Sequence, residues 1–425
     1  MNTLYKGAEV FLPDGTVQQA DIAVTGDLIV EVGKVRADWR ADEVVDMRGK
    51  FAVPGFVNAH THASMTLLRS YADDMNLMDW LQKKIWPVEA KMTADDIYWG
   101  AMLAAVEMIK SGTTAFADMY GPNMECVAEV VKESGMRASL CRGLIGLSPA
   151  RYEALQTNID LYDQYHGKAE GRITVMFGPH APYTCSPEYL RDVVQEAAKR
   201  KAEIHIHLAE TKGEVEGCIA EYGCTPFKHM ENLGVLQQGV LAAHCVHLTA
   251  EDIALMKKYN VRVAHNPGSN MKLASGISPV PKLLEAGICT ALGTDGASSN
   301  NNLDMLEEAR LAALLHKTDT YDPAAVPAAA ALKMATENGA EALGLKKVGR
   351  LAKGYKADIT FFDTNSAAWC PKHNLVSLLI YSANSADVDT VVVNGKTLMK
   401  NRELLTLDEE RIMYEAGRCA ANLVK

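Results

Sequence analysis

Short apolar segments that alternate with longer helical patterns constrain the fold of this chain more than any other feature of its sequence. Each segment is rich in Val, Ile, Ala or Phe and is followed by polar residues or by Gly and Pro, the pattern of a buried strand that ends in a loop. Eight such segments occur, at residues 52–58, 113–118, 137–142, 173–177, 203–207, 239–244, 262–264 and 289–293. The sequence therefore predicts an α/β protein in which strands and helices alternate.

The segments between these strands carry helical patterns with recognisable starts. Thr93 precedes Asp95 and Asp96, which favours a helix over 93–110, and Pro187 suits the first turn of a helix over 187–201. Further helices are expected over 249–258 and 303–316. Eight strands that alternate with helices are what a closed (β/α)8, TIM-like barrel requires. An open doubly wound sheet is the alternative, but no glycine-rich dinucleotide turn follows the first strand.

The two ends of the chain follow a different pattern. Short strands within residues 2–50 are broken by Asp14-Gly15 and Gly26-Asp27, and Asn394-Gly395 interrupts those of 356–400; these dipeptides are hairpin signals. Neither end has enough apolar residues to fold alone. We expect residues 1–52 and 350–425 to form one small β-sandwich domain, including a last helix over 408–423, beside a barrel of residues 53–349.

The composition excludes several classes of protein. The chain has 425 residues, a net charge of −10 and a pI near 5.7, so neither a nucleic acid nor an anionic membrane is an expected partner. No segment reaches the roughly 20 apolar residues that span a bilayer. The first 15 residues lack the pattern of a secretion signal. Nine cysteines without CxxC spacing favour reduced thiols and a cytoplasmic protein.

Histidines and acids follow the predicted strands at their carboxyl ends, where a barrel places its chemistry. Side chains two apart share a strand face, so His60 and His62 can both point into the barrel mouth. A third imidazole from another strand and a carboxylate would complete a site for zinc or iron(II). The strand ends that supply such groups are His60-Thr61-His62, Pro179-His180-Ala181, the run from His205 to Glu210, Ala243-His244-Cys245 and Thr294-Asp295-Gly296.

The fifth strand offers two histidines, because His205 and His207 both face inward. His207 lies nearer the strand end, so we choose it as the ligand and expect His205 to pack behind the site. Glu210 can serve the site only if the strand has already ended before it. His247 is expected to face away from the site. The isolated histidines are expected to be structural: His166, His229, His316 and His373.

A single metal held in this way would lower the pKa of a bound water towards 7 and supply hydroxide. Asp295 would bind the metal through one oxygen and take the proton of the water with the other. Glu210 would carry a proton to a ring nitrogen, and His244 would hydrogen-bond the water or the oxyanion. The third and fourth strands end in Arg142-Gly143 and Pro179-His180, without the lysine that a two-metal site usually needs. We therefore expect a hydrolase with one divalent metal ion per subunit.

These motifs resemble the amidohydrolase superfamily over residues 53–302. The match rests on Pro54-Gly55-Phe56-Val57-Asn58-Ala59-His60-Thr61-His62, His207 with Glu210, Ala243-His244-Cys245 and Leu292-Gly293-Thr294-Asp295-Gly296. Within the superfamily the chain looks most similar to the 5-methylthioadenosine/S-adenosylhomocysteine deaminases, through Trp86-Pro87-Val88-Glu89, Arg142-Gly143, residues 178–183, His265-Asn266-Pro267 and residues 297–301. The resemblance implies hydrolytic deamination of an adenosine-type nucleoside to the inosine-type product and ammonia.

The resemblance also implies a role for each matching residue. The metal, usually zinc, would be bound by His60, His62, His207 and Asp295, and the catalytic residues would be Glu210, His244 and Asp295. Glu89 would accept the two ribose hydroxyls, because a carboxylate takes two donors at once. His180 and Glu210 would contact the base, and Trp86 would pack on the ribose or thioether. Arg151, together with Arg142, would reach an amino-acid tail, and since such an arginine can come from a neighbouring subunit, a homo-oligomer is expected.

Two other functions are also compatible with the sequence. A hydrolase of the same architecture that acts on guanine, cytosine or a chlorinated triazine would share the metal site but would not need Glu89 for a ribose. A metal-binding scaffold without turnover would lack a ligand or a proton carrier, and the chain has all of them.

Overall fold

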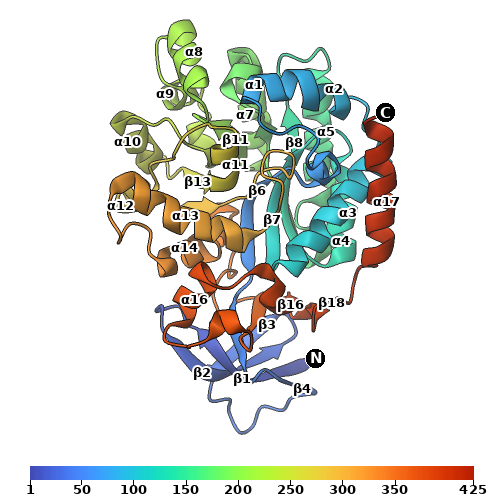
Figure 1. The fold of residues 1–425 in the computed structure, drawn as a ribbon. Helices are drawn as coiled ribbons and strands as arrows, with labels where there is room; N and C mark the ends of the chain where they lie inside the picture. The colour runs from blue at the N-terminus through green and yellow to red at the C-terminus, as the bar shows by residue number, and fades with distance from the viewer.

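Two parallel β-sheets form the centre of the protein, and helices surround them (Figure 1). The computed structural model describes residues 1–425. The five-stranded sheet contains β6 (Phe56–Thr61), β7 (Thr113–Tyr120), β8 (Arg137–Leu144), β9 (Ile173–Val175) and β10 (Gly178–Pro179). The four-stranded sheet contains β11 (Ile204–Leu208), β12 (Val240–His244), β13 (Arg262–His265) and β14 (Thr290–Leu292). The predicted mixed α/β fold is confirmed.

The two sheets adjoin at both of their edges. On one side a parallel bridge joins Phe177 to Ile204. On the other side the Asp295 amide, just beyond β14, donates to the His60 carbonyl of β6 at 2.9 Å. Small side chains such as Ala115 and Ala264 belong to the buried cluster that these strands share. The carboxyl ends of β6 and β11–β14 therefore come together around one point.

The helices lie on the outside of these sheets, in the order that the sequence predicts. Thr93 forms the capping box that begins α3, as expected from the acids that follow it, and Thr249 forms a second capping box at the start of α10. The longer helices are α3 (Ala94–Lys110), α4 (Met124–Ser134), α5 (Arg151–Tyr165), α7 (Pro187–Arg200), α8 (Lys212–Tyr222), α10 (Ala250–Lys258) and α13 (Met305–Thr320). The shorter helices are α1 (Leu77–Trp80), α2 (Trp86–Glu89), α6 (Lys168–Gly171), α9 (Pro226–Asn232), α11 (Pro267–Lys272), α12 (Val280–Glu285), α14 (Ala328–Met334), α15 (Glu337–Ala342) and α16 (Leu375–Tyr381).

Short 3-10 and π-helical segments complete the connections. A π-helical turn, η2 (Leu81–Ile85), joins α1 to α2. The 3-10 turns are η1 (Ala63–Leu68), η3 (Pro182–Thr184), η4 (Leu236–Gln238), η5 (Ala367–Trp369) and η6 (Ser385–Asp387).

The chain ends share a separate sheet of nine strands, drawn at the foot of Figure 1. Its order is β18-β17-β16-β15-β5-β1-β2-β3, with β4 paired to β1. The bounds are β1 (Asn2–Phe11), β2 (Val17–Thr25), β3 (Leu28–Gly33), β4 (Glu43–Asp46), β5 (Lys50–Pro54), β15 (Ile359–Asp363), β16 (Val388–Val393), β17 (Lys396–Lys400) and β18 (Glu403–Leu404). These strands are hydrogen-bonded into one sheet, where the sequence suggested the two sheets of a sandwich.

Two of the predicted strands are each divided in the structure. The segment 52–58 is split at Gly55, so that β5 belongs to the terminal sheet and β6 to the central one. A Cβ at Gly55 would lie 2.2 Å from the Thr114 side chain, so only glycine allows this close crossing. The segment 173–177 ends at Val175, and β10 begins at Gly178.

The last helix, α17 (Glu409–Leu423), lies against α3 rather than against the terminal sheet with which it was grouped (Figure 1). Its apolar side, which includes Ile412 and Leu423, is buried in the same cluster as Ile97 of α3. An ion pair between Lys110 and Glu409, 2.7 Å long, joins the two helices at one end. The pairing reflects an apolar stripe that needs a helix face as its partner.

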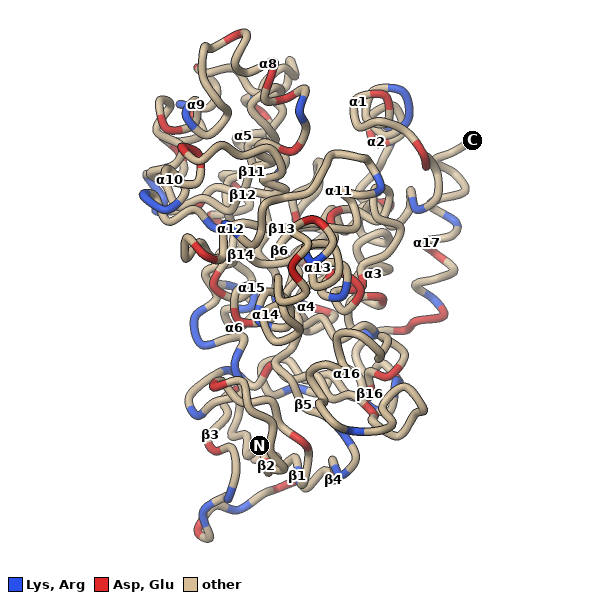
Figure 2. The backbone as a smooth tube through the Cα atoms, turned by 60° about the vertical axis from the view of Figure 1, so that its left-hand side comes forward, with Lys and Arg blue, Asp and Glu red and all other residues tan.

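Acidic and basic residues are interspersed along the whole chain, and no basic stripe forms (Figure 2). No helix of the structure has the length and apolar character needed to cross a membrane.

A buried ion pair connects the terminal sheet to the central one. The Arg137 guanidinium of β8 donates from Nε to Asp358 Oδ2 at 2.5 Å and from Nη2 to Asp358 Oδ1 at 3.0 Å. The two side chains are only 3% and 1% exposed. The Asn394 amide also donates to Asp358 at 2.7 Å. Because both charges are out of water, each depends on the other for its solvation.

Asp358→Asn is expected to destabilise the protein by about 3–5 kcal/mol, because it leaves the Arg137 charge buried without a counterion. Urea unfolding followed by circular dichroism measures the change. Asp46→Asn, which removes the exposed partner of Arg48, is the control and should leave the unfolding midpoint unchanged. Equal midpoints for the two variants would contradict the role of the buried pair.

Candidate active site

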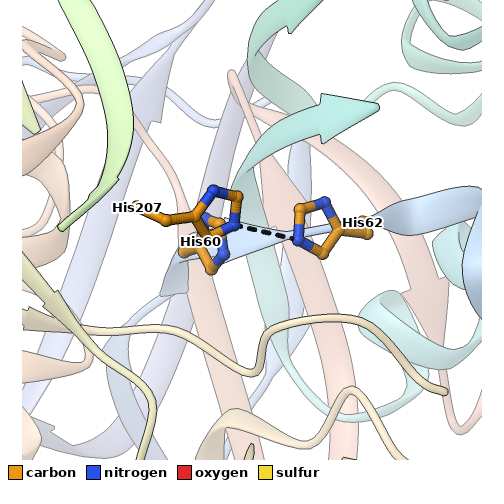
Figure 3. A group of neighbouring side chains, drawn as sticks. All are labelled: His60, His62 and His207. Carbon is orange, nitrogen blue, oxygen red and sulfur yellow. Dashed lines mark hydrogen bonds between the residues drawn. The ribbon is translucent and has the colours of Figure 1, made fainter. Parts of the chain in front are cut away.

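The ends of three strands bring three imidazoles and one carboxylate together. His60 and His62 come from the end of β6, His207 from β11, and Asp295 follows β14. The Nε2 atoms of His62 and His207 are 3.3 Å apart, and the histidine rings converge as Figure 3 shows. Asp295 Oδ1 lies 3.3 Å from His60 Nε2 and 3.1 Å from His62 Nε2. The four predicted ligand atoms therefore face one point.

The other ring nitrogen of each of these histidines is already engaged. His62 Nδ1 bonds to the Met119 carbonyl, and His207 Nδ1 bonds to the His180 carbonyl at 2.7 Å. His60 Nδ1 contacts His205 Nε2 at 2.9 Å. A carbonyl only accepts, so His62 and His207 each carry a proton on Nδ1, and Nε2 is the atom that each ring directs to the cluster. His205 thus supports the site from behind, as the sequence predicts.

The chemistry of this donor set fits a divalent metal. His60 Nε2 is buried and has no hydrogen bond, an expensive state for a nitrogen that no ligand uses. Burial lowers the pKa of His60 to about 4 and keeps that ring neutral. The Asp295 carboxylate, acting against burial, raises the pKa of His62 to about 9, so without a metal ion this ring is a cation, and a bound metal would take the place of its Nε2 proton. Three imidazole nitrogens and one carboxylate oxygen are a ligand set that zinc or iron(II) accepts.

A second cluster, made of His60, His244 and Asp295, also has its donor atoms within 4.8 Å of one another. His244 lies at the end of β12, and its Nε2 is 3.8 Å from Glu210 Oε2. His244 was expected to hydrogen-bond the attacking water or the oxyanion, and Glu210 to carry a proton; the structure brings both to the metal-ligand cluster.

Asp295 differs in one respect from its predicted arrangement. Its Oδ2 accepts hydrogen bonds from Ser269 Oγ at 2.6 Å and from Ser299 Oγ at 2.8 Å. Two hydroxyls therefore occupy the oxygen that was expected to take the proton of the water. The remaining oxygen, Oδ1, faces the imidazoles. Asp295 is thus oriented by its serine partners with one oxygen directed to the ligand cluster.

Residues with left-handed backbone conformations occur at the strand ends that carry the functional residues. Ala209 has φ 54°, which ends β11 and turns Glu210 into the site, so the condition set for Glu210 is met. His244 and Asp295 have φ 74° and 62°. Such conformations are costly for residues with a Cβ, and they persist where the surrounding structure enforces them.

Glu214 holds the turn that presents Glu210. Its two carboxylate oxygens accept hydrogen bonds from the amides of Ala209 and Glu210, at 2.8 and 2.9 Å. Burial raises the pKa of Glu214 to about 7 and also raises the pKa of Glu210. Burial thus favours the protonated form of Glu210 more than that of an exposed carboxyl, which suits Glu210 for carrying a proton.

A cavity of about 450 Å³ opens over the metal-ligand cluster. One wall is apolar and comes from residues 77–92, where Trp80 and Leu81 face the space. The predicted site residues on its surface are His62, Trp86, Glu89, Arg142, His180, His207, Glu210, His244 and Asp295. The size and the few polar groups are typical of a small-molecule site.

Glu89 enters this cavity from the end of α2. Its Oε1 accepts a hydrogen bond from the Tyr120 hydroxyl at 2.7 Å, and burial raises its pKa. Glu89 Oε2 accepts no hydrogen bond from another side chain and remains available to a ligand with hydroxyl donors.

The two arginines of the sequence analysis lie in different places. Arg142 lines the cavity, and its Nε is buried without a hydrogen-bond partner. Arg151 does not line the cavity; its guanidinium lies over the Tyr152 ring, 4.9 Å from the centroid. The structure therefore brings Arg142, and not Arg151, to the site of its own chain.

Sequence reasoning missed several residues that contact the site. Ser299 belongs to a polar run that follows Asp295, and Tyr120 ends β7, so the strand-end rule could have identified both. Ser269, Asn270 and Glu214 act through other side chains. Their contacts depend on tertiary packing, and no spacing in the sequence signals them.

The chain is similar in sequence and in fold to known proteins. Residues 51–398 match the model of the amidohydrolase family. A 5-methylthioadenosine/S-adenosylhomocysteine deaminase from Pelotomaculum thermopropionicum is 55% identical, over 100% of this chain and 99% of its own. A zinc-bound adenosine deaminase from Xanthomonas campestris is 34% identical with a TM-score of 0.95, over 99% of this chain and 98% of its own. A zinc complex of an atrazine chlorohydrolase from Arthrobacter aurescens is 27% identical with a TM-score of 0.92, over 98% and 100%.

His207→Ala is expected to lose the metal, because it removes one of the converging nitrogens. His205→Ala should keep it with an affinity lowered by about 10–100-fold, since it removes only the support behind His60. Elemental analysis after dialysis and competition with a chelator measure both effects. Full occupancy in His207→Ala, or complete loss in His205→Ala, would reverse the assignment of the two histidines.

Proposed function

The chain belongs to the amidohydrolase family, and we propose that it is a metal-dependent deaminase of adenosine-type nucleosides. Its product would be the inosine-type nucleoside, with ammonia released. The observation that carries the proposal is the meeting, in one cavity, of the metal-ligand cluster with Glu89 and Arg142. The relatives named as deaminases of 5-methylthioadenosine and S-adenosylhomocysteine support this substrate class.

The proposed architecture is a closed (β/α)8 barrel of residues 53–349 beside a second unit from residues 1–52 and 350–425. The two adjoining edges of the central sheets support closure. The likeness to the zinc-bound adenosine deaminase supports the same arrangement over nearly the full chain.

The proposed metal is one zinc ion per subunit, with iron(II) as the alternative. His60, His62, His207 and Asp295 would hold it. When bound, the metal would supply Lewis acidity and lower the pKa of a water molecule from about 16 towards 7.

The protein's own residues would bind and orient the reacting groups. His244 Nε2 would accept a hydrogen bond from the attacking water, and Glu210 would carry a proton to a ring nitrogen of the purine. Water oxygen would bond to C6, the bond from C6 to the exocyclic nitrogen would break, and that nitrogen would leave as ammonia. His180, whose pKa burial lowers to about 3, would contact the base as a neutral ring.

Glu89, Trp86 and Arg142, which also line the cavity, define the proposed substrate. Glu89 would accept hydrogen bonds from the ribose hydroxyls, and Trp86 would pack on the ribose or thioether. A partly buried guanidinium with an unpartnered nitrogen favours an anionic ligand. Arg142 would therefore bind the carboxylate of S-adenosylhomocysteine, which neither adenosine nor 5-methylthioadenosine has.

We propose further that the protein is a cytoplasmic homo-oligomer. All nine cysteines are free, which suits a reducing compartment. Arg151 lies outside the cavity of its own chain, near the exposed side chains of Leu147 and Tyr152, and would reach a neighbouring subunit's cavity.

Glu89→Ala separates this function from a hydrolase of free bases or triazines. For adenosine and 5-methylthioadenosine we expect kcat/KM to fall about 10–100-fold, because hydrogen bonds to a charged group contribute about 1.5–3 kcal/mol. Adenine and guanine have no ribose, so any turnover of them should be unaffected. Metal-loaded wild type should deplete adenine absorbance of the nucleosides; no depletion, or equal losses for nucleosides and bases, would contradict the proposal.

Arg142→Ala is expected to lower the ratio of kcat/KM for S-adenosylhomocysteine to that for adenosine by about tenfold or more, since only the former carries an anionic tail. Steady-state kinetics with the two substrates measure the ratio. Arg151→Ala is the matched variant, and an effect there would indicate a contribution across subunits. An unchanged ratio in Arg142→Ala would remove Arg142 from substrate recognition.

A further inference from the structure

The imidazole of His244 contacts the side-chain amide of Asn270, which has no role in the proposed reaction so far. Asn270 lies on α11, and its Oδ1 is 2.8 Å from His244 Nδ1. Both side chains are buried, each about 1% exposed. The other nitrogen of the ring, Nε2, lies on the cavity side, 3.8 Å from Glu210 Oε2.

The partner at Nδ1 decides where the proton of the neutral ring resides. An amide oxygen only accepts, so Nδ1 donates to Asn270 Oδ1 and Nε2 is bare. Asn266 Nδ2 also faces Nδ1, but at 3.3 Å it is the more distant group. The shorter contact therefore selects the tautomer with the proton on Nδ1.

A bare Nε2 is placed to act on a proton-bearing group in the cavity. The 3.8 Å gap to Glu210 is too long for a direct hydrogen bond. A water molecule or a ring N–H at this position would have an acceptor on the His244 side. The opposite tautomer would present a donor there and could not accept a proton.

We propose that Asn270 is a positioning residue that keeps the proton of His244 on Nδ1 and so presents Nε2 as the acceptor for the attacking water. This inference rests on the proposed deaminase function. In this arrangement Asp295 Oδ2 can accept hydrogen bonds from the two serine hydroxyls, because His244 Nε2 is the acceptor that faces the water.

The helix that carries Asn270 is itself tightly fixed. Its neighbour Ser269 donates to Asp295, so one short helix orients both His244 and Asp295. The Gly268 amide donates to Glu308 Oε2 at 3.0 Å, and a Cβ at Gly268 would lie 2.4 Å from Glu308 Oε1. Because α11 cannot shift freely, it can hold the two side chains in register with the ligand cluster.

The test compares Asn270→Ala with Asn270→Asp in the metal-loaded enzyme. The alanine variant loses the acceptor, and we expect kcat for the nucleoside to fall about 100-fold, the lower range for a misplaced general base, with KM changed less than about threefold. Asn270→Asp keeps an acceptor oxygen and should restore at least about a third of the wild-type kcat. Met271→Ala, an exposed position on the same helix, is the matched control for changes in α11.

A second measurement reads the tautomer without reference to turnover. ¹⁵N spectra of histidine-labelled, metal-loaded enzyme, with His244 assigned by its substitution, distinguish a protonated from a bare ring nitrogen. We expect protonated Nδ1 and bare Nε2 in wild type and in Asn270→Asp, and loss of this state in Asn270→Ala at unchanged metal content.

A bare Nδ1 in the wild type would overturn the inference, as would a fall in kcat that the aspartate variant does not rescue. Wild-type enzyme that shows the expected tautomer but deaminates no nucleoside would instead refute the proposed function and leave the positioning of His244 by Asn270 intact. The two failures are therefore distinguishable.

Discussion

The backbone hydrogen bond from the Asp295 amide to the His60 carbonyl, 2.9 Å long, is the contact on which the site depends. It joins the segment after the last parallel strand to the end of the first. The Thr61 hydroxyl adds a bond to the Asp295 carbonyl at 2.9 Å. At the same junction the Asn58 side-chain amide donates to the Thr294 hydroxyl at 2.7 Å. Without these hydrogen bonds the Asp295 carboxylate would not face the imidazoles, because residues 58–61 and 294–295 are far apart in the sequence.

Burying these polar groups together costs free energy of desolvation. Each group therefore has a hydrogen-bond partner on the side that faces away from the cluster. Buried polar groups destabilise a fold unless they are hydrogen-bonded. His62 and His207 therefore use backbone carbonyls, and His60 uses His205. Asp295 receives two hydroxyls on the oxygen that faces away from the cluster. What remains unsatisfied, above all His60 Nε2, is the part that a metal ion would complete.

The same fold occurs in proteins that are named for different substrates, and we propose that the cavity wall makes the distinction here. A zinc-bound adenosine deaminase and an atrazine chlorohydrolase both superpose on nearly the whole chain. Fold and metal chemistry therefore do not determine the substrate. The groups that we propose for this role here are Glu89 on α2 and Arg142 near the end of β8, which line the same cavity as the ligand cluster.

The sequence by itself determined the groups that stand at strand ends, because strand periodicity and the carboxyl-end rule act locally. His60, His62, His207, His244 and Asp295 were identified in this way, and so was the capped start of α3 at Thr93. The tertiary structure alone decided that β5 and β6 separate at Gly55, that α17 packs on α3, and that Arg142 rather than Arg151 lines the cavity. It also decided the partners of each ring, such as Asn270 for His244. These features depend on contacts between distant segments, which no local pattern of residues records.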